Sequence, residues 1–183
     1  TTGAKNTAIG TDTMCGNTTG GYNTASGYKA LLSNTTGAKN TASGAYALKA
    51  NTTGSYNTAV GSCALRYNTT SSYNTAIGWR ASANQTTGYH NTASGNYALR
   101  LTTTGCLNTA TGSKALYSNT TGNYNTTLGV CTLYASVTGN YQTAIGYMAL
   151  CKNTLGTYNH GVGVYALTKN TSGGFNTASG MYT

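Results

Sequence analysis

The amino-acid sequence predicts an all-β protein that folds as a parallel β-solenoid, or β-roll. A 17-residue unit, T-T-G-x-Y-N-T-A-x-G-x-x-A-L-x-x-N, recurs through all 183 residues without an insertion or a deletion. A short period held this strictly indicates that each unit has the same structure and stacks on the one before it. Helical repeats are longer, about 33 residues or more. Gly holds position 10 of every unit, which would weaken a helix but suits the corners of a coil.

The repeat array is one domain that covers residues 1–183. We expect its ten complete units and thirteen further residues to form about eleven coils, and the array to be a segment of a longer protein. Because neighbouring strands lie about 4.8 Å apart, eleven coils predict a rod ~50 Å long. The units start at residues 1, 18, 35, 52, 69, 86, 103, 120, 137, 154 and 171.

The composition indicates an ordered chain in spite of its low complexity. Charged residues make up only 6% of the sequence and Pro is absent, whereas disordered chains are usually charged, rich in Pro and poor in aromatic residues. The sixteen Tyr residues also fall at fixed positions of the unit. Aromatic and β-branched residues favour strands, so we expect two short strands per coil, Y-N-T-A-x and x-x-A-L-x.

The columns of the repeat predict which side chains point inward. Position 7 is almost always Thr, position 9 is small or branched, and position 14 is Leu in eight of ten units. Side chains two apart share a face of a strand, so we place positions 7, 9 and 14 in a thin core. Positions 11, 12, 15 and 16 hold eight of the ten basic residues and are expected to face solvent. The representative core leucines are Leu31, Leu48 and Leu65.

Stacking of coils turns two further columns into predicted ladders. Amide side chains at position 6 are expected to bond from coil to coil, as in cross-β Asn ladders. Rings at position 5 are expected to stack in an offset arrangement. The Asn ladder includes Asn23, Asn40, Asn57 and Asn74, and the aromatic ladder includes Tyr22, Tyr56, Tyr73, Tyr124, Tyr141 and Tyr158.

The sequence offers no catalytic constellation, and we expect neither enzyme activity nor a cofactor or metal. Asp12 is the only acidic residue, which excludes paired carboxylates and an Asp-backed triad within one chain. His90 and His160 lie about four coils apart, or ~20 Å at the strand spacing. The five cysteines fall at positions too distant for intrachain disulfides.

Eight asparagines fit the N-x-[S/T] pattern of N-glycosylation acceptors, although Asn and Thr are common enough here to match by chance. If the source glycosylates secreted proteins, they predict a stripe of sugars along one turn. They are Asn17, Asn34, Asn51, Asn68, Asn84, Asn119, Asn125 and Asn170.

The repeat resembles two related groups of surface proteins. Residues 56–61 (Y-N-T-A-V-G) and 73–78 (Y-N-T-A-I-G), the first followed by x-x-A-L, resemble the N-S-V-A-I-G repeats in the heads of trimeric autotransporter adhesins. The whole unit is more similar to the N-T-T-G-x-Y-N-T-A-x-G-Y-x-A-L arrays of bacterial and viral tail-fibre-like proteins. This resemblance covers the full chain. It implies a left-handed parallel β-roll, often trimeric, on the surface of a cell or virion.

Two classes of function fit these observations. The first is an extracellular structural fibre or adhesin-like shaft that associates with itself, as a filament or a homotrimer. The second is a flat-face ligand binder, for ice or for a polysaccharide. The net charge of +9 is spread evenly, which suits contact with an acidic polysaccharide or cell surface but is too sparse for nucleic acid. We expect no membrane insertion in this segment.

Overall fold

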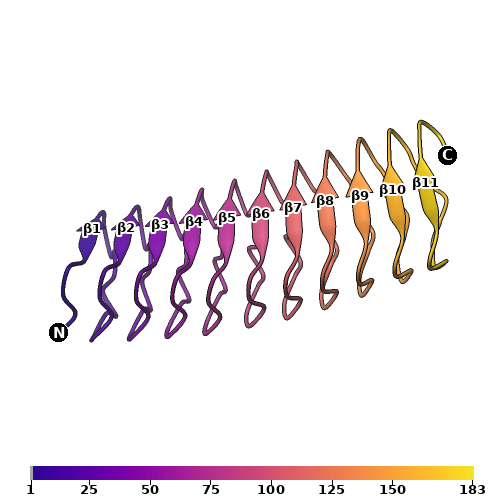
Figure 1. Ribbon diagram of the computed structural model, residues 1–183. Helices are drawn as coiled ribbons and strands as arrows, with labels where there is room; N and C mark the ends of the chain where they lie inside the picture. Colours follow the sequence, from indigo (N-terminus) through magenta and orange to yellow (C-terminus); the bar gives the residue numbers. More distant parts are fainter. Residues whose placement is uncertain (1) are drawn as a thin grey trace.

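The computed structural model describes residues 2–183 and confirms the β-solenoid (Figure 1). We number the coils 1 to 11 after the repeat units. Each coil contains one three-residue strand at positions 7 to 9, and no helix occurs in residues 2–183. The strands are β1 (Thr7–Ile9), β2 (Thr24–Ser26), β3 (Thr41–Ser43), β4 (Thr58–Val60), β5 (Thr75–Ile77), β6 (Thr92–Ser94), β7 (Thr109–Thr111), β8 (Thr126–Leu128), β9 (Thr143–Ile145), β10 (His160–Val162) and β11 (Thr177–Ser179).

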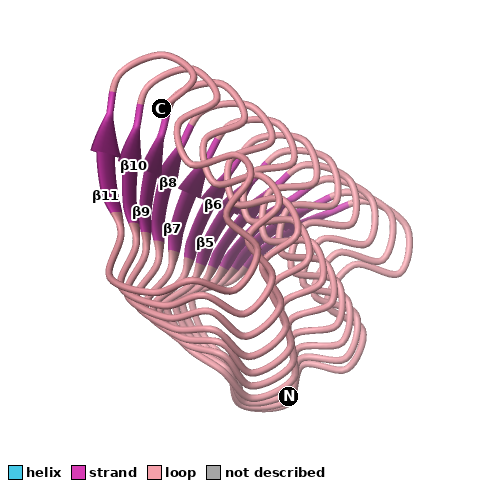
Figure 2. Ribbon diagram, turned by 90° about the vertical axis from the view of Figure 1, so that its right-hand side faces the viewer, coloured by secondary structure: helices cyan, strands magenta, loops and turns pink. Residues whose placement is uncertain are grey.

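The strands form one parallel sheet in chain order, from β1 to β11. Each residue pairs with its equivalent one unit later, as Thr41 does with Thr58 and Ala42 with Ala59. In Figure 2 the C-terminal coil faces the viewer and the chain turns clockwise as it advances toward the viewer. The solenoid is therefore left-handed.

The core lies between the strand and the segment at positions 13 and 14. Ala25, Ala30 and Leu31 are representative: position 8 of the strand and positions 13 and 14 are fully buried in most coils. The leucines expected in the core, Leu31, Leu48 and Leu65, are buried. The interior is narrow, so small Ala side chains fill two of its three columns and Leu fills the third.

The prediction that positions 7 and 9 lie in the core is wrong. In β2 and β3, for example, Ala25 and Ala42 are buried while the flanking Thr and Ser residues are exposed. Side chains alternate along a strand, so burial of position 8 forces positions 7 and 9 outward. The branched residues at position 9 suggested burial of that position. The interior of the coil is narrow, however, and it accommodates the small Ala at position 8 instead.

The second predicted strand, x-x-A-L-x, is also wrong, because this segment forms turns. Lys29 and Leu31 have φ of 55° and 49°, in the left-handed region, which interrupts an extended strand. The segment still bonds to its neighbours: Leu31 N–H donates to the carbonyl of Ala47 in the next coil at 3.0 Å. Hydrogen bonds between coils therefore continue outside the sheet.

Buried amides connect the coils on the side of position 6. The backbone N–H of Asn57 donates to Oδ1 of Asn40 at 2.9 Å, and the side chain of Asn57 donates to the carbonyl of Ser71 in the following coil, also at 2.9 Å. The same pattern includes the predicted ladder residues Asn23, Asn40, Asn57 and Asn74, whose side chains are 0–1% exposed. The side chain of each Asn therefore satisfies two buried backbone groups of the following coil, an N–H and a carbonyl.

A second amide ladder at position 17 is shorter. Nδ2 of Asn34 donates to Oδ1 of Asn17, and the chain of bonds continues through Asn51 to Asn68, each at 2.8 Å. The column then changes to Gln85, which begins a different local network.

Candidate functional site

The outward side of the sheet is the longest regular surface of the molecule. Its strands lie side by side in one row along the rod (Figure 1). Position 7 presents Thr in ten of eleven coils, and position 9 presents Ser, Thr, Val, Ile or Leu. Neither column contains Asp, Glu, Lys or Arg. We call the outward side chains at positions 7 and 9 the strand face.

The strand face combines hydroxyl and apolar groups at regular spacing. Neighbouring strands place equivalent atoms about 4.8 Å apart, and positions 7 and 9 lie about 6.6 Å apart along each strand. Several apolar members are well exposed, among them Ile9, Val60, Ile77 and Leu128. An exposed, uncharged lattice of this kind can order water or bind a flat, repetitive ligand.

An aromatic ladder runs along position 5 beside the strand face. Tyr56 stacks on Tyr73, and Tyr73 on His90, with ring centroids 4.9 Å apart in both pairs. A second run joins Tyr124, Tyr141, Tyr158 and Phe175 at 4.8–4.9 Å with nearly parallel rings. The Tyr residues of the ladder are about half exposed and Phe175 is more so, so the rings stabilise the stack and also offer apolar surface to a ligand.

Lysine replaces the ring at position 5 in two coils and joins the ladder. Lys5 Nζ bonds to the hydroxyl of Tyr22 at 2.9 Å, and Lys39 Nζ bonds to that of Tyr56 at 3.0 Å. Each ammonium also lies over the ring it bonds, 4.8 and 4.9 Å from the centroid. The hydrogen bond with Tyr56 raises the pKa of Lys39. The aromatic column thus continues as cation–π pairs.

The two histidines are far apart and lie in different columns. His90 stacks on Tyr73 within the aromatic ladder, and His160 is exposed on the strand face. Asp12 lies near Lys29, with Nζ and Oδ2 3.9 Å apart. Within residues 2–183, no three His, Cys, Asp or Glu side chains gather to hold a metal ion.

Burial removes most of the candidate glycosylation sites from solvent. The Asn side chains at 17, 34, 51, 68, 119 and 125 are 0–8% exposed, because they belong to the amide columns at positions 6 and 17. A glycan on such a side chain is incompatible with the folded coil. Only Asn84 and Asn170 are partly exposed.

The five cysteine thiols are free and differ in exposure. Cys15 is exposed, Cys106 and Cys131 are half-buried, and Cys63 and Cys151 are buried. Burial raises the pKa of the Cys151 thiol, with a smaller contribution from nearby Cys131. Burial therefore disfavours the reactive thiolate at Cys151.

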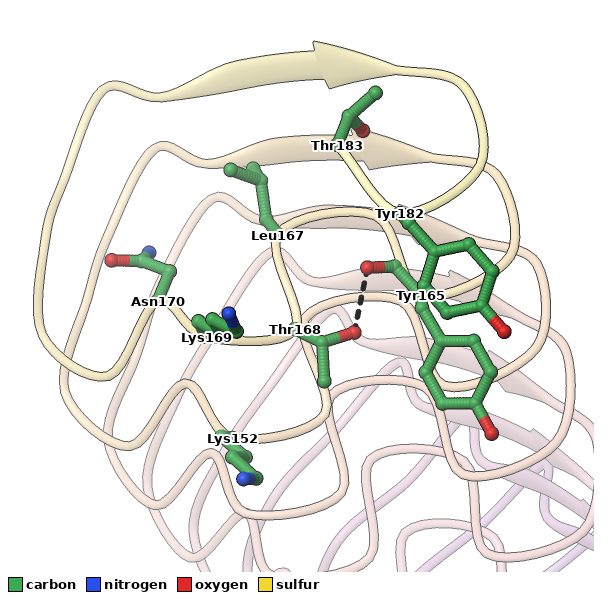
Figure 3. Close-up of a pocket in the computed structure, with 8 residues that line it drawn as sticks. All are labelled: Lys152, Tyr165, Leu167, Thr168, Lys169, Asn170, Tyr182 and Thr183. Atoms are coloured by element: carbon green, nitrogen blue, oxygen red, sulfur yellow. Dashed lines mark hydrogen bonds between the residues drawn. The ribbon is translucent and has the colours of Figure 1, made fainter.

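A cavity of about 500 Å³ lies among the last three coils (Figure 3). Tyr165, Leu167 and Tyr182 line it, and Thr168 Oγ1 donates to the carbonyl of Tyr165 at 2.7 Å. Lys152, Lys169 and Asn170 complete its polar side, and no acidic residue lines it.

Residues 2–183 contain no helix that is long and apolar enough to cross a membrane.

No protein-family model matches the chain, and no significant similarity links it to a curated protein or a solved structure. The class of protein is therefore defined by the fold alone: a tandem-repeat β-solenoid.

Proposed function

We propose that this chain is a stiff structural shaft of an extracellular fibre, displayed on a cell or virion surface. The observation that carries the proposal is the unbroken series of parallel strand pairs from β1 to β11, all in the same 17-residue register. A solenoid contacts only its neighbouring coils, so its length grows with the number of repeats while its cross-section stays constant. Such a protein acts by length and stiffness and needs no catalytic group.

Self-association follows from the repeat itself. The top of each coil is complementary to the bottom of the next, so contact between two copies is head-to-tail and extends into an open filament. His160 N–H donates to the carbonyl of Asn176 in the next coil at 2.8 Å. Lateral association into a homotrimer rests on the resemblance to adhesin heads.

Small-angle scattering and electron microscopy across a concentration series test this function. We expect rods at least ~50 Å long, which lengthen by end-to-end contact as the concentration rises. Compact particles at every concentration would contradict the shaft.

The strand face favours a second function, binding of ice or of a flat polysaccharide. The specific observation is that the Thr column at position 7 points outward on a strand, with a second uncharged column beside it. Hydroxyl and methyl groups at fixed spacing can hold water or sugar rings in a regular array. The aromatic ladder at position 5 adds stacking surface for sugars.

Thermal hysteresis and binding to insoluble polysaccharides distinguish this function from a passive shaft. Thr92→Lys places a charge in the centre of the strand face and should abolish either activity. Thr19→Lys adds the same charge at an exposed residue of position 2, outside the strand face. This variant should keep the activity of the unmodified chain. Absence of both activities in the unmodified chain would leave the shaft as the function.

A further inference from the structure

Coil 5 departs from the repeat and opens a notch on the surface of the rod. Position 15 of that coil is Ala83, whereas the same position carries Arg66 in coil 4 and Arg100 in coil 6. Arg80, at position 12 of coil 5, lines the same cavity, which measures about 130 Å³. Three arginine residues from three successive coils therefore line one cavity beside a short side chain.

No acidic side chain balances these three charges. Asp12 is the only carboxylate side chain of the protein, and it lies in coil 1 beside Lys29. The remaining residues that line the notch are Cys63, Tyr67, Ala83 and Asn84. The notch therefore gathers three positive charges with no acidic side chain among its lining residues.

Aromatic rings hold the guanidinium groups in place. Arg66 lies 5.0 Å from the ring centroids of Tyr46 and Tyr67, and Arg80 lies 4.9 Å from that of Trp79. Stacked guanidinium groups lose less freedom when they bind an anion, because their orientation is already restricted.

Arg100 is fixed in a similar way, by the rings of Tyr97 and Tyr117 at 5.2 and 5.6 Å. Its Nη1 also donates to the hydroxyl of Tyr117 at 2.6 Å. The Nε atoms of Arg66 and Arg100 are buried and find no hydrogen-bond partner among residues 2–183. Because these two Nε atoms are closed off from solvent, the donors that the notch can offer to an anion are the other guanidinium nitrogens of the arginines that line it.

We propose that the notch binds a tetrahedral oxyanion, either sulfate or phosphate, free or as an ester on an acidic polysaccharide. Guanidinium groups match the oxygens of such anions with paired N–H donors. Three of them, approaching from coils 4, 5 and 6, suit a tetrahedral group better than a planar carboxylate. The cavity has room for about four water molecules, each with a share of about 30 Å³ in the liquid, which is enough for one small anion.

The site does not depend on the shaft function. An isolated rod and a filament both present the notch, and a strand face that binds nothing leaves it unchanged. Rod length from scattering and anion affinity are separate measurements, so either proposal can fail alone.

Trp79 provides a direct probe of the site. It is the only tryptophan of the chain, and Arg80 lies over its ring. We expect sodium sulfate and sodium phosphate, titrated at constant ionic strength against chloride, to change the fluorescence of Trp79 with saturation. Titration calorimetry on the same samples gives the stoichiometry, which should be one anion per chain.

Three variants separate a built site from general charge. Arg66→Gln with Arg100→Gln removes two of the three positive charges that line the notch and should weaken binding about 100-fold, at about tenfold for each charged hydrogen-bonding group. Ala83→Tyr keeps every charge but fills the notch with a side chain that position 15 carries in coils 7 and 8, and it should block binding. Lys114→Gln removes a charge from position 12 outside the notch and should bind like the unmodified chain.

Binding experiments with sulfated and unsulfated polymers identify the source of the anion. Binding of dextran sulfate but not of unsulfated dextran, lost in Ala83→Tyr, would indicate a sulfated polysaccharide. Binding of inorganic sulfate alone would indicate a free anion. Equal affinities in Ala83→Tyr and the unmodified chain, or no saturable binding of either anion, would overturn the proposal.

Discussion

Ser82 donates a hydrogen bond from its hydroxyl to Oε1 of Gln85 at 2.8 Å, inside the core of coil 5. Other coils carry Leu at the first of these positions, or Met in coil 1, and most carry Asn at the second. Gln85 Nε2 donates onward to the carbonyl of Gly88 at 2.6 Å, which is the bond that Asn makes in neighbouring coils. The shorter Ser and the longer Gln therefore compensate for each other.

This pairing predicts that Ser82→Leu alone gains little, although position 14 is core. The burial of Leu, about 1.5–3 kcal/mol, is offset by the lost hydrogen bond and by crowding against Gln85. The double variant Ser82→Leu with Gln85→Asn restores the pair that most coils carry. Its gain in the free energy of unfolding should exceed the sum of the two single-variant effects by about 1–3 kcal/mol. Urea unfolding of the four proteins measures this coupling. Simple additivity would show that the two side chains do not share space.

The position 6 ladder predicts a large cost for removal of one amide. Asn57→Ala leaves the N–H of Asn74 without its acceptor, and it removes one of the two side-chain donors to the carbonyl of Ser71, which keeps Nδ2 of Asn68 at 3.1 Å. An unpaired buried group costs about 1–3 kcal/mol, so the free energy of unfolding should fall by about 1–3 kcal/mol. Asn84→Ala, at a partly exposed side chain, should change it by less than about 0.5 kcal/mol. Similar values for the two variants would rule out a structural role for the ladder.

Gly61 illustrates why position 10 is invariant along the chain. Its φ is 125°, and a Cβ at this residue would lie 2.6 Å from the carbonyl oxygen of Gly78. We expect Gly61→Ala to destabilise the protein by about 2–4 kcal/mol, through backbone strain and overlap with the next coil. Gly21 has no positive φ and occupies a position that is Ala in other units, so Gly21→Ala should change the stability by less than about 1 kcal/mol. Thermal unfolding of both variants checks the difference.

The repeat predicted the coil length, the parallel register and the absence of helix, because all three follow from the period and from Gly at position 10. It did not reveal the direction of the strand side chains. Thr, Ala and a branched residue at positions 7 to 9 are consistent with either face inward, since no strongly polar residue marks the outer side. The small size of Ala at positions 8 and 13 was the signal for a narrow core.

The turns that replace the predicted second strand, x-x-A-L-x, have a signal in the sequence. Positions 5, 12 and 14 have φ between 46° and 63° in every coil that the structure describes. None of these three columns contains Val, Ile or Thr, although Thr is among the commonest residues of the chain. β-branched side chains are strongly disfavoured in this conformation. Their absence from alternate positions 12 and 14 indicates turns there rather than a strand. The notch at coil 5 was beyond prediction, because it depends on the ring contacts of three separate arginines.

Burial of Cys151 predicts slow alkylation. The thiolate is the reactive form, and the raised pKa of Cys151 reduces the thiolate fraction at any pH below that value. At about pH 8 we expect iodoacetamide to modify the exposed Cys15 well before Cys151. The pH profile of Cys151 should move to lower pH in urea, where burial is lost. Peptide mass spectrometry follows each site, and an unchanged profile in urea would contradict the burial effect.

Tyr141 tests the left-handed backbone of position 5, independently of ring stacking. Its φ is 54°, and its ring stacks between those of Tyr124 and Tyr158. Tyr141→Asn and Tyr141→Val both remove the ring, but Asn tolerates this conformation and Val does not. We expect the Val variant to be less stable than the Asn variant by about 1–3 kcal/mol in urea unfolding. At Thr121, an exposed residue without a positive φ, the same two substitutions should differ by less than about 0.5 kcal/mol. Equal stability of the two Tyr141 variants would mean that the backbone at position 5 can leave the left-handed region at no cost.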